Sequence, residues 1–243
     1  MKWYAGPEGD QRIWYEFEEI ELIAEDELRR AKLIPPASRP VTDLERFIEE
    51  HLKVKLDQYC DLPDGVLGIS QFQARRSPTI SISRGLTELA ECDTPPAGAL
   101  GRWRATMAHE AAHVLLHRYL FEPGLAPHAP SGLDAPKKES TGLMRCLTGD
   151  VVPVNDNNWA QVRRKSDWRE VQANRGMAAL LMPSRTFNRV AALQLSALSM
   201  SSVTRGSTNA TTLATAMAEL FKVSKQAATI RLESLSIIAT PLP

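Results

Sequence analysis

The stretch TMAHEAAHVLLH, from Thr106 to His117, restricts the fold of this chain more than any other segment. It lies in a run from Arg102 to Leu120 that contains neither glycine nor proline and is rich in alanine and leucine. Such residues favour helix, so we expect one helix from Leu100 to about Leu120. The small alanines around the histidines leave room for other elements to approach, which predicts that this helix is packed inside the protein.

His109, Glu110 and His113 form the pattern HExxH within this stretch. Residues four apart on a helix project from the same face, one turn apart, so both imidazoles can bind one metal ion. Glu110 is offset around the helix, where its carboxylate can act as the general base toward a water on that ion. A buried helix with hydrogen-bonded histidines is the alternative, and the motif favours the metal site.

A catalytic zinc site needs a third protein ligand. His117 lies near the helix end, so a structural or surface role is expected for it. Glu170 is the stronger candidate, on a second helix predicted from about Trp159 to Leu181. Asn174 follows it on the same face and could accept the N–H of one imidazole. Spacing alone would make Glu170 no more than a solvated helix charge.

Composition narrows the partners that this chain can have. The 243 residues carry 29 basic and 29 acidic side chains, so there is no general attraction to nucleic acid or to a membrane surface. The three cysteines form no CxxC pair and the polar N-terminus has no signal-peptide core, which together predict a cytoplasmic protein. No apolar run reaches the roughly 18 residues of a membrane span, so no membrane partner is expected.

Residues 1–40 are expected to form an N-terminal extension and linker. Helical spacing predicts a helix from Ile13 to Lys32, and the prolines of LIPPASRP end it. Residues 41–200 are expected to form the main domain. Its first helix, at VTDLERFIEEHL, begins where Thr42 and Glu45 fit a capping box.

Short strands are predicted in two places within the main domain. Gly65–Phe72 and Thr79–Ser83 have strand-like patterns, so we expect a small antiparallel or mixed sheet. Residues 123–158 are rich in proline, glycine and polar side chains and are expected to form a loop. Another helix is predicted from Ala191 to Met200. The fold class is therefore predicted to be α+β and mainly helical.

Residues 208–243 are expected to form a small helical subdomain. Apolar spacing in this part predicts two short helices joined at KVS, the shape of a helix-turn-helix. Lys222, Lys225 and Arg231 decorate the pair, so direct nucleic-acid binding is one interpretation. The small number of charges and the neutral chain favour a structural or partner-docking role instead.

Five segments occur in the order typical of one family of bacterial metallopeptidases. They are DLERFIEEHL, DLPDGVLGISQF, TMAHEAAHVLLH, WREVQANRGMAALLMP and AELFKVSKQAATIRLESL. On these segments the chain resembles the ImmA/IrrE family over roughly residues 41–238. The resemblance implies a zincin-like metallopeptidase domain followed by a helix-turn-helix-like segment.

The resemblance also implies a metal-dependent endopeptidase. The implied site consists of the metal ligands His109, His113 and Glu170, the catalytic base Glu110, and Asn174 beside the ligands. Zn2+ is the implied cofactor, with Mn2+ as the alternative, and the usual order of divalent-metal affinities favours zinc. The implied partner is a protein substrate, a helix-turn-helix transcriptional repressor that is cut in a stress or mobile-element response. An extended substrate is expected to add to an edge strand, for which TISIS is the candidate.

The chain departs from the family pattern at two positions. Many relatives carry Glu where this chain has Gln172, and Gly176 stands where an aromatic residue is common. If the position of Gln172 supplied the metal ligand, this chain would have lost that ligand. A second hypothesis is therefore a catalytically weak or inactive sensor or scaffold that binds a repressor or DNA without cutting it.

Overall fold

The computed structural model describes residues 2–5, 11–73, 76–122, 142–147, 168–199 and 203–239. The fold is α+β, as predicted. The helices are α1 Phe17–Arg30, α2 Leu44–Arg46, α3 Arg84–Glu91, α4 Ala99–His117, α6 Trp168–Leu181, α7 Ser184–Ala197, α8 Thr208–Phe221 and α9 Lys225–Ser234, with a π-helical turn at Phe47–His51 and a 3-10 turn at Arg118–Leu120. The strands are β1 Lys2–Ala5, β2 Gln11–Trp14, β3 Lys55–Cys60, β4 Val66–Gln73, β5 Arg76–Ser83 and β6 Gly142–Leu147.

Four strands form a mixed sheet in the order β3-β5-β4-β6. β4 is antiparallel to both β5 and β6, whereas β3 runs parallel to β5. Strand β5 contains TISIS and lies between two neighbours, so the expectation that TISIS is an edge strand is wrong. Local alternation predicts a strand, but only the pairing of distant segments determines which strand lies at the edge. Among the described strands, β3 and β6 are the outer ones.

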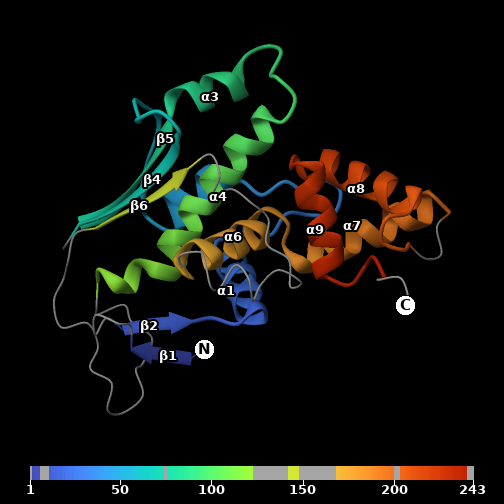
Figure 1. Cartoon of the computed structure of the whole chain (residues 1–243), viewed down its shortest axis with the longest axis horizontal. Coiled ribbons are helices and arrows are strands. Elements are labelled where there is room, and N and C mark those ends of the chain that lie inside the picture. Colours follow the sequence, from blue (N-terminus) through green and yellow to red (C-terminus); the bar gives the residue numbers. More distant parts are fainter. Residues whose placement is uncertain are drawn as a thin grey trace.

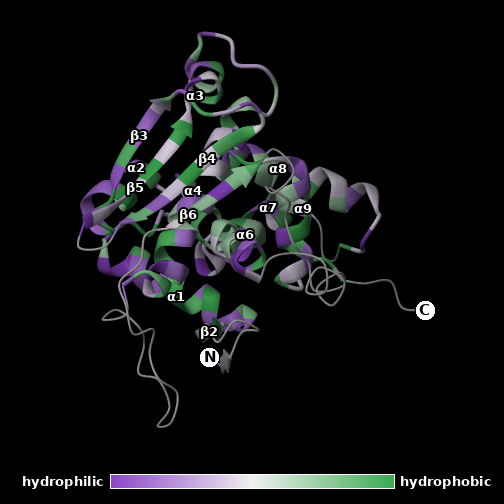
Figure 2. Cartoon of the chain, turned by 60° about the vertical axis from the view of Figure 1, so that its left-hand side comes forward, coloured by the Kyte–Doolittle hydropathy of each residue, from purple (hydrophilic) through white to green (hydrophobic). Residues whose placement is uncertain are grey.

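The sheet packs one face against helix α4. Along β5 the buried positions Ile80 and Ile82 alternate with less buried Thr79 and Ser81, a hydropathy pattern that Figure 2 shows along the strand. Ile80 and Ile82 are buried in the same core as Met107 of α4, and this burial stabilises the packing of the sheet on α4. The predicted helix over Leu100–Leu120 is confirmed, since α4 and the 3-10 turn after it cover this range.

Helix α6 packs directly on α4. A Cβ atom at Gly176 would lie 2.7 Å from the Cβ of Ala112, so glycine at this position allows the two backbones to approach closely. In Figure 1, α4 and α6 lie together between the sheet and the C-terminal helices.

The N-terminal segment differs from its prediction. The residues expected to begin a helix at Ile13 form strand β2 instead, and helix α1 begins only at Phe17, with a capping box between Glu16 and Glu19. Ile13 is fully buried in a small cluster with Tyr119. Tertiary contacts override the helical spacing here, because Ile13 lies against the end of α4.

Several predicted boundaries need correction. Strand β3 was not predicted, and β6 falls within residues 123–158, which were expected to be a loop. In β6 the exposed positions include Leu143, so polar–apolar alternation is weak there. The remainder of the predicted loop lies outside the described residues, as do residues 159–167 of the predicted second helix. Helix α7 starts directly after Pro183 rather than near Ala191.

The first helix of the main domain is capped by Asp43 rather than by Thr42. The Asp43 side chain accepts a hydrogen bond from the backbone N–H of Arg46. Thr42 is buried and donates from its hydroxyl to the backbone oxygen of Leu180, 2.7 Å away. The local pattern therefore predicted a helix cap, but the hydroxyl group of Thr42 forms a long-range hydrogen bond instead of capping the helix.

Helices α7, α8 and α9 gather at the end of the molecule away from the sheet (Figure 1). The two predicted short helices are present as α8 and α9, joined by a turn in which Lys222 adopts a positive φ of 56°. Within the described part of the chain, no helix combines the length and apolar character needed to cross a membrane.

Candidate metal centre

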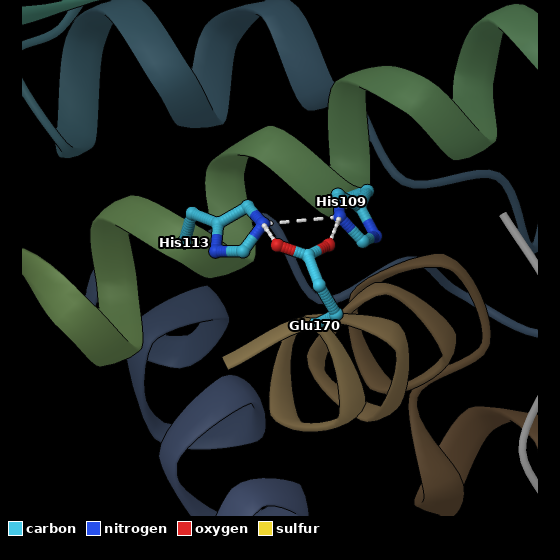
Figure 3. A group of neighbouring side chains, drawn as sticks. All are labelled: His109, His113 and Glu170. Atoms are coloured by element: carbon cyan, nitrogen blue, oxygen red, sulfur yellow. Dashed lines mark hydrogen bonds and ion pairs between the residues drawn. The ribbon is translucent and has the colours of Figure 1, made fainter. Parts of the chain in front are cut away.

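His109 and His113 project from one face of α4 toward helix α6, which contributes Glu170. One ligand atom from each of the three residues lies within 4.8 Å of the other two. The Nε2 atoms of the two histidines are 3.0 Å apart, and the Glu170 oxygens lie 3.1 Å from His109 Nε2 and 3.4 Å from His113 Nε2. Figure 3 shows the Glu170 carboxylate directed at both imidazoles. His109 and His113 therefore share one face of α4, as their spacing predicted, and Glu170 joins them from α6.

Gln172 points away from the trio. Its Oε1 atom lies 3.0 Å from Nε2 of His117, and its amide nitrogen donates to the backbone oxygen of Ile13. Glu170 therefore faces the two histidines and Gln172 does not. The departure of Gln172 from the family pattern removes no carboxylate from this centre.

Both histidines have a polar partner on the side away from Glu170. His109 Nδ1 lies 3.2 Å from Oδ1 of Asn174, the partner that the sequence predicted. His113 Nδ1 lies 3.1 Å from Nδ1 of His117, which is fully buried. The surface role considered for His117 is thus excluded, and its structural role consists of contacting a candidate metal ligand directly.

Glu110 lies between α4 and the sheet, fully buried. The Ser70 hydroxyl on β4 donates to its carboxylate and to its backbone oxygen. Gly68, two residues earlier, makes space for the side chain, because a Cβ atom at Gly68 would lie 2.9 Å from Glu110 Oε1. That oxygen makes no hydrogen bond of ordinary geometry within the described residues. A buried carboxylate oxygen without such a bond can accept one from a water or a substrate.

Burial and neighbouring charges set the pKa values of the centre without metal. Burial raises the pKa of Glu110 to about 7, although His109 and the Ser70 hydrogen bond oppose the rise. Burial would also raise the pKa of Glu170, but its contacts with His109 and His113, at 3.1 and 3.4 Å, outweigh burial and lower it. Glu170 is therefore a carboxylate at neutral pH, as a metal ligand must be.

The histidines are shifted in different directions. Burial works against the charged form of His109, yet the contacts with Glu170 and the charge of Glu110 raise its pKa. Burial lowers the pKa of His113 and, more strongly, that of His117. Neutral imidazoles are the form that binds metal ions, so His113 needs to release no proton to become a ligand.

The residues present fit a divalent metal. Two imidazole nitrogens and one carboxylate oxygen form the donor set of catalytic zinc sites, which leave a fourth position to water. His109 and His113 are completely buried, whereas the side chain of Glu170 is 23% exposed, so water can approach from the Glu170 side. The arrangement can therefore hold a metal ion and place a buried carboxylate, Glu110, beside it.

Three contributors to this centre were not recognised from sequence: Gly68, Ser70 and the role of His117. Gly68 and Ser70 occupy successive buried positions of β4, between Val66 and Phe72. A glycine and a serine on the inward face of an otherwise apolar strand are a detectable signal for a close polar neighbour. His117 repeats the four-residue spacing of the two candidate ligands, which places it on their helix face.

Comparison with known proteins returns no relative: no family model matches the chain, and no match is found among curated proteins or solved structures.

Proposed function

We propose that this chain is a zinc-dependent endopeptidase that cuts a specific partner protein, a helix-turn-helix transcriptional repressor, in the manner implied by its resemblance to the ImmA/IrrE family. One observation carries the proposal. The ligand group of His109, His113 and Glu170 lies beside a buried glutamate, Glu110, whose pKa is close to neutral. A purely structural metal site requires only its ligands and no general base such as this carboxylate.

Bound zinc would supply a water of lowered pKa and would polarise the peptide carbonyl. Glu110 would take up the proton that an attacking water gives up as its oxygen adds to the carbonyl carbon. The same carboxyl group then gives the proton to the leaving nitrogen as the C–N bond breaks. Burial raises the pKa of Glu110 to about 7 in the metal-free protein, and a group that titrates near the working pH can both accept and donate a proton.

Strand β6 is the candidate edge for an extended substrate. It is an outer strand among those described, and the backbone of Cys146 in β6 interacts with the carboxyl group of Glu110. Leu143 and Leu147 of the same strand are 50% and 46% exposed. A peptide added to this edge would pass close to Glu110 and would cover both leucines, which supports cleavage of a protein segment in extended conformation.

The alternative is a protein that binds a repressor or DNA without cutting it. One argument for it came from Gln172, which contacts His117 instead of the ligand group. Another came from the basic residues of α8 and α9. Of these, Arg231 is buried, with its guanidinium bound to Glu21 and to the Met182 backbone oxygen, so it is not presented to phosphates. Each contact therefore removes one argument for the alternative.

The test is cleavage of helix-turn-helix repressors encoded near this chain. Each repressor is incubated with zinc-loaded parent protein, with Glu110→Gln, and with Glu219→Gln, which changes an exposed glutamate on α8 as a control. We expect a defined product by mass spectrometry with the parent and the control. Glu110→Gln should give no product while it retains about one zinc per chain. Undiminished cleavage by Glu110→Gln would refute the role of Glu110, and stable binding without any product would favour the alternative.

A further inference from the structure

We propose that His117 and Gln172 are positioning residues: they form a chain of hydrogen bonds that starts in the N-terminal strand β2 and determines which nitrogen of His113 is available to a metal. Gln172 Nε2 donates to the Ile13 backbone oxygen at 3.1 Å, and Gln172 Oε1 lies 3.0 Å from His117 Nε2. His117 Nδ1 in turn lies 3.1 Å from His113 Nδ1. The inference extends the proposed metal site to residues that cannot reach the metal.

The direction of the chain is determined at its outer end. A backbone carbonyl can only accept hydrogen bonds, so the amide of Gln172 must present its N–H group to Ile13 and its oxygen to His117. His117 therefore carries its proton on Nε2. A neutral imidazole has one ring proton, which leaves His117 Nδ1 as an acceptor.

The same reasoning then applies to His113. Because His117 Nδ1 accepts, His113 Nδ1 must carry the proton and donate it. The lone pair of a neutral His113 is then on Nε2, the atom that lies 3.4 Å from Glu170 Oε1 and 3.0 Å from His109 Nε2. The chain thus selects the tautomer of His113 in which the nitrogen facing the ligand group is free.

Water cannot replace these hydrogen bonds, because the residues that form them are not accessible to solvent. Ile13, His117 and Gln172 are each 0% exposed. Trp168 covers His117, edge to face with a ring-centroid distance of 5.3 Å, and the Arg12 guanidinium lies 5.9 Å from the Trp168 ring. Removal of one link would leave a buried donor or acceptor unpaired, so the links are expected to act together.

The strand that supplies the first acceptor is itself held at the end of α4. The backbone N–H of Ile13 donates to the Tyr119 hydroxyl at 2.8 Å, so Ile13 is hydrogen-bonded through both its N–H and its C=O. The N-terminal segment, which the sequence presents as an extension, is in this way part of the candidate metal centre. An ionised glutamate at position 172 could accept a hydrogen bond from His117 but could not donate one to Ile13. The series of hydrogen bonds therefore requires glutamine at this position.

The ring tautomers can be measured in the metal-free protein by long-range 1H–15N NMR correlation. We expect the parent to show His113 protonated on Nδ1. Gln172→Met removes both hydrogen bonds and retains an unbranched side chain, and it should produce a mixture of His113 tautomers. His51→Gln is the control, because His51 is paired with Glu27 away from this centre, and it should leave the His113 signals unchanged.

Zinc affinity, measured by competition with a chromophoric chelator, is the second readout. Partners of metal-bound histidines typically contribute 10–100-fold in affinity, so Gln172→Met and His117→Phe should weaken zinc binding by about that factor. His117→Asn retains an acceptor near the position of Nδ1 and should restore part of the loss. A packing role alone would favour phenylalanine over asparagine, so the order of these two variants keeps the test decisive even if one of them is unstable.

The inference depends on the proposed function only for the use of the free nitrogen, and the two can fail separately. A His113 protonated on Nε2 in the parent, or a tautomer and a zinc affinity unaffected by Gln172→Met, would overturn the hydrogen-bond chain and leave the peptidase proposal intact. The other outcome is that the parent protein shows the Nδ1–H tautomer of His113, loses it in Gln172→Met, and yet binds no zinc. That result would support the hydrogen-bond chain and overturn the peptidase proposal.

Discussion

Arg231 of α9 and Glu21 of α1, 210 positions apart in the chain, form a two-point ion pair in which the arginine side chain is 1% exposed. Arg231 also donates to the backbone oxygen of Met182, at the end of α6. The pair therefore joins the first and last helices to the helix that carries Glu170. The segments predicted as an N-terminal extension and a C-terminal subdomain are in direct contact.

This ion pair should contribute strongly to stability. Glu21→Ala leaves the buried guanidinium of Arg231 without its carboxylate, and we expect the free energy of unfolding in urea to fall by about 3 kcal/mol. Arg231→Met, which removes the charge itself, should cost less. Asp26→Ala, at an exposed pair with Arg29, is the control and should cost less than about 1 kcal/mol. Equal effects of Glu21→Ala and Asp26→Ala would contradict the prediction.

Glycine at position 68 should be required for the placement of Glu110. In Gly68→Ala the new methyl group would meet Thr106 Cγ2 at 2.8 Å and Glu110 Oε1 at 2.9 Å, so we expect a loss of stability of about 1–3 kcal/mol. Cleavage should fall further than zinc affinity, because the metal ligands are not displaced. Gly85→Ala, where nothing lies within 4 Å, is the matched control. If both variants melt at the same temperature, the close approach of β4 and α4 at Gly68 does not restrict the side chain at this position, and the prediction is wrong.

The metal-free protein should lose stability between about pH 4.5 and pH 7 because of Glu110. Burial raises the folded-state pKa of Glu110 from 4.5 to about 7, so the folded state holds this proton more tightly than the unfolded state. The resulting stabilisation is fully present below pH 4.5 and is lost as pH rises to about 7, a change of about 3 kcal/mol. Glu110→Gln does not titrate, so the difference between the two unfolding curves should follow this window. A difference that is constant with pH would contradict the raised pKa.

Zinc should stabilise the folded protein through the three proposed ligands. At a free zinc concentration of 100 times the Kd, we expect about 2.7 kcal/mol of added stability, which chelators remove. In Glu170→Gln the zinc affinity should fall by more than about tenfold, since even partners of ligands contribute that much. Calorimetry with Glu219→Gln as control measures the difference. Parent-like zinc binding by Glu170→Gln would exclude Glu170 as a ligand.

Substrate binding at β6 should depend on its exposed leucines. Leu143→Ser and Leu147→Ser remove apolar surface that an added strand would cover, so we expect KM to rise severalfold while zinc content is unchanged. Leu193 on α7 is 55% exposed and lies on a different element, and Leu193→Ser is the control. An unchanged KM in both β6 variants would place the substrate elsewhere.

The parts of the site that follow from local geometry were predictable from the sequence. Helix α4 follows from a run rich in alanine and leucine that has no glycine or proline after Gly101, and the shared face of His109 and His113 follows from their spacing of four. Helices α8 and α9 likewise follow from apolar spacing. In each case the determining residues are covalent near neighbours, so their relative positions depend on helix geometry alone.

Other features depend on contacts between segments far apart in the chain. Spacing alone would have left Glu170 as a solvated charge, yet the packing of α6 on α4 through Gly176 directs it to the histidines. The same packing brings Gln172 to His117, and the parallel pairing of β3 with β5 makes β5 an inner strand. A local sequence pattern does not predict such contacts. They are stabilised by burial and hydrogen bonds that form only when the distant segments pack together.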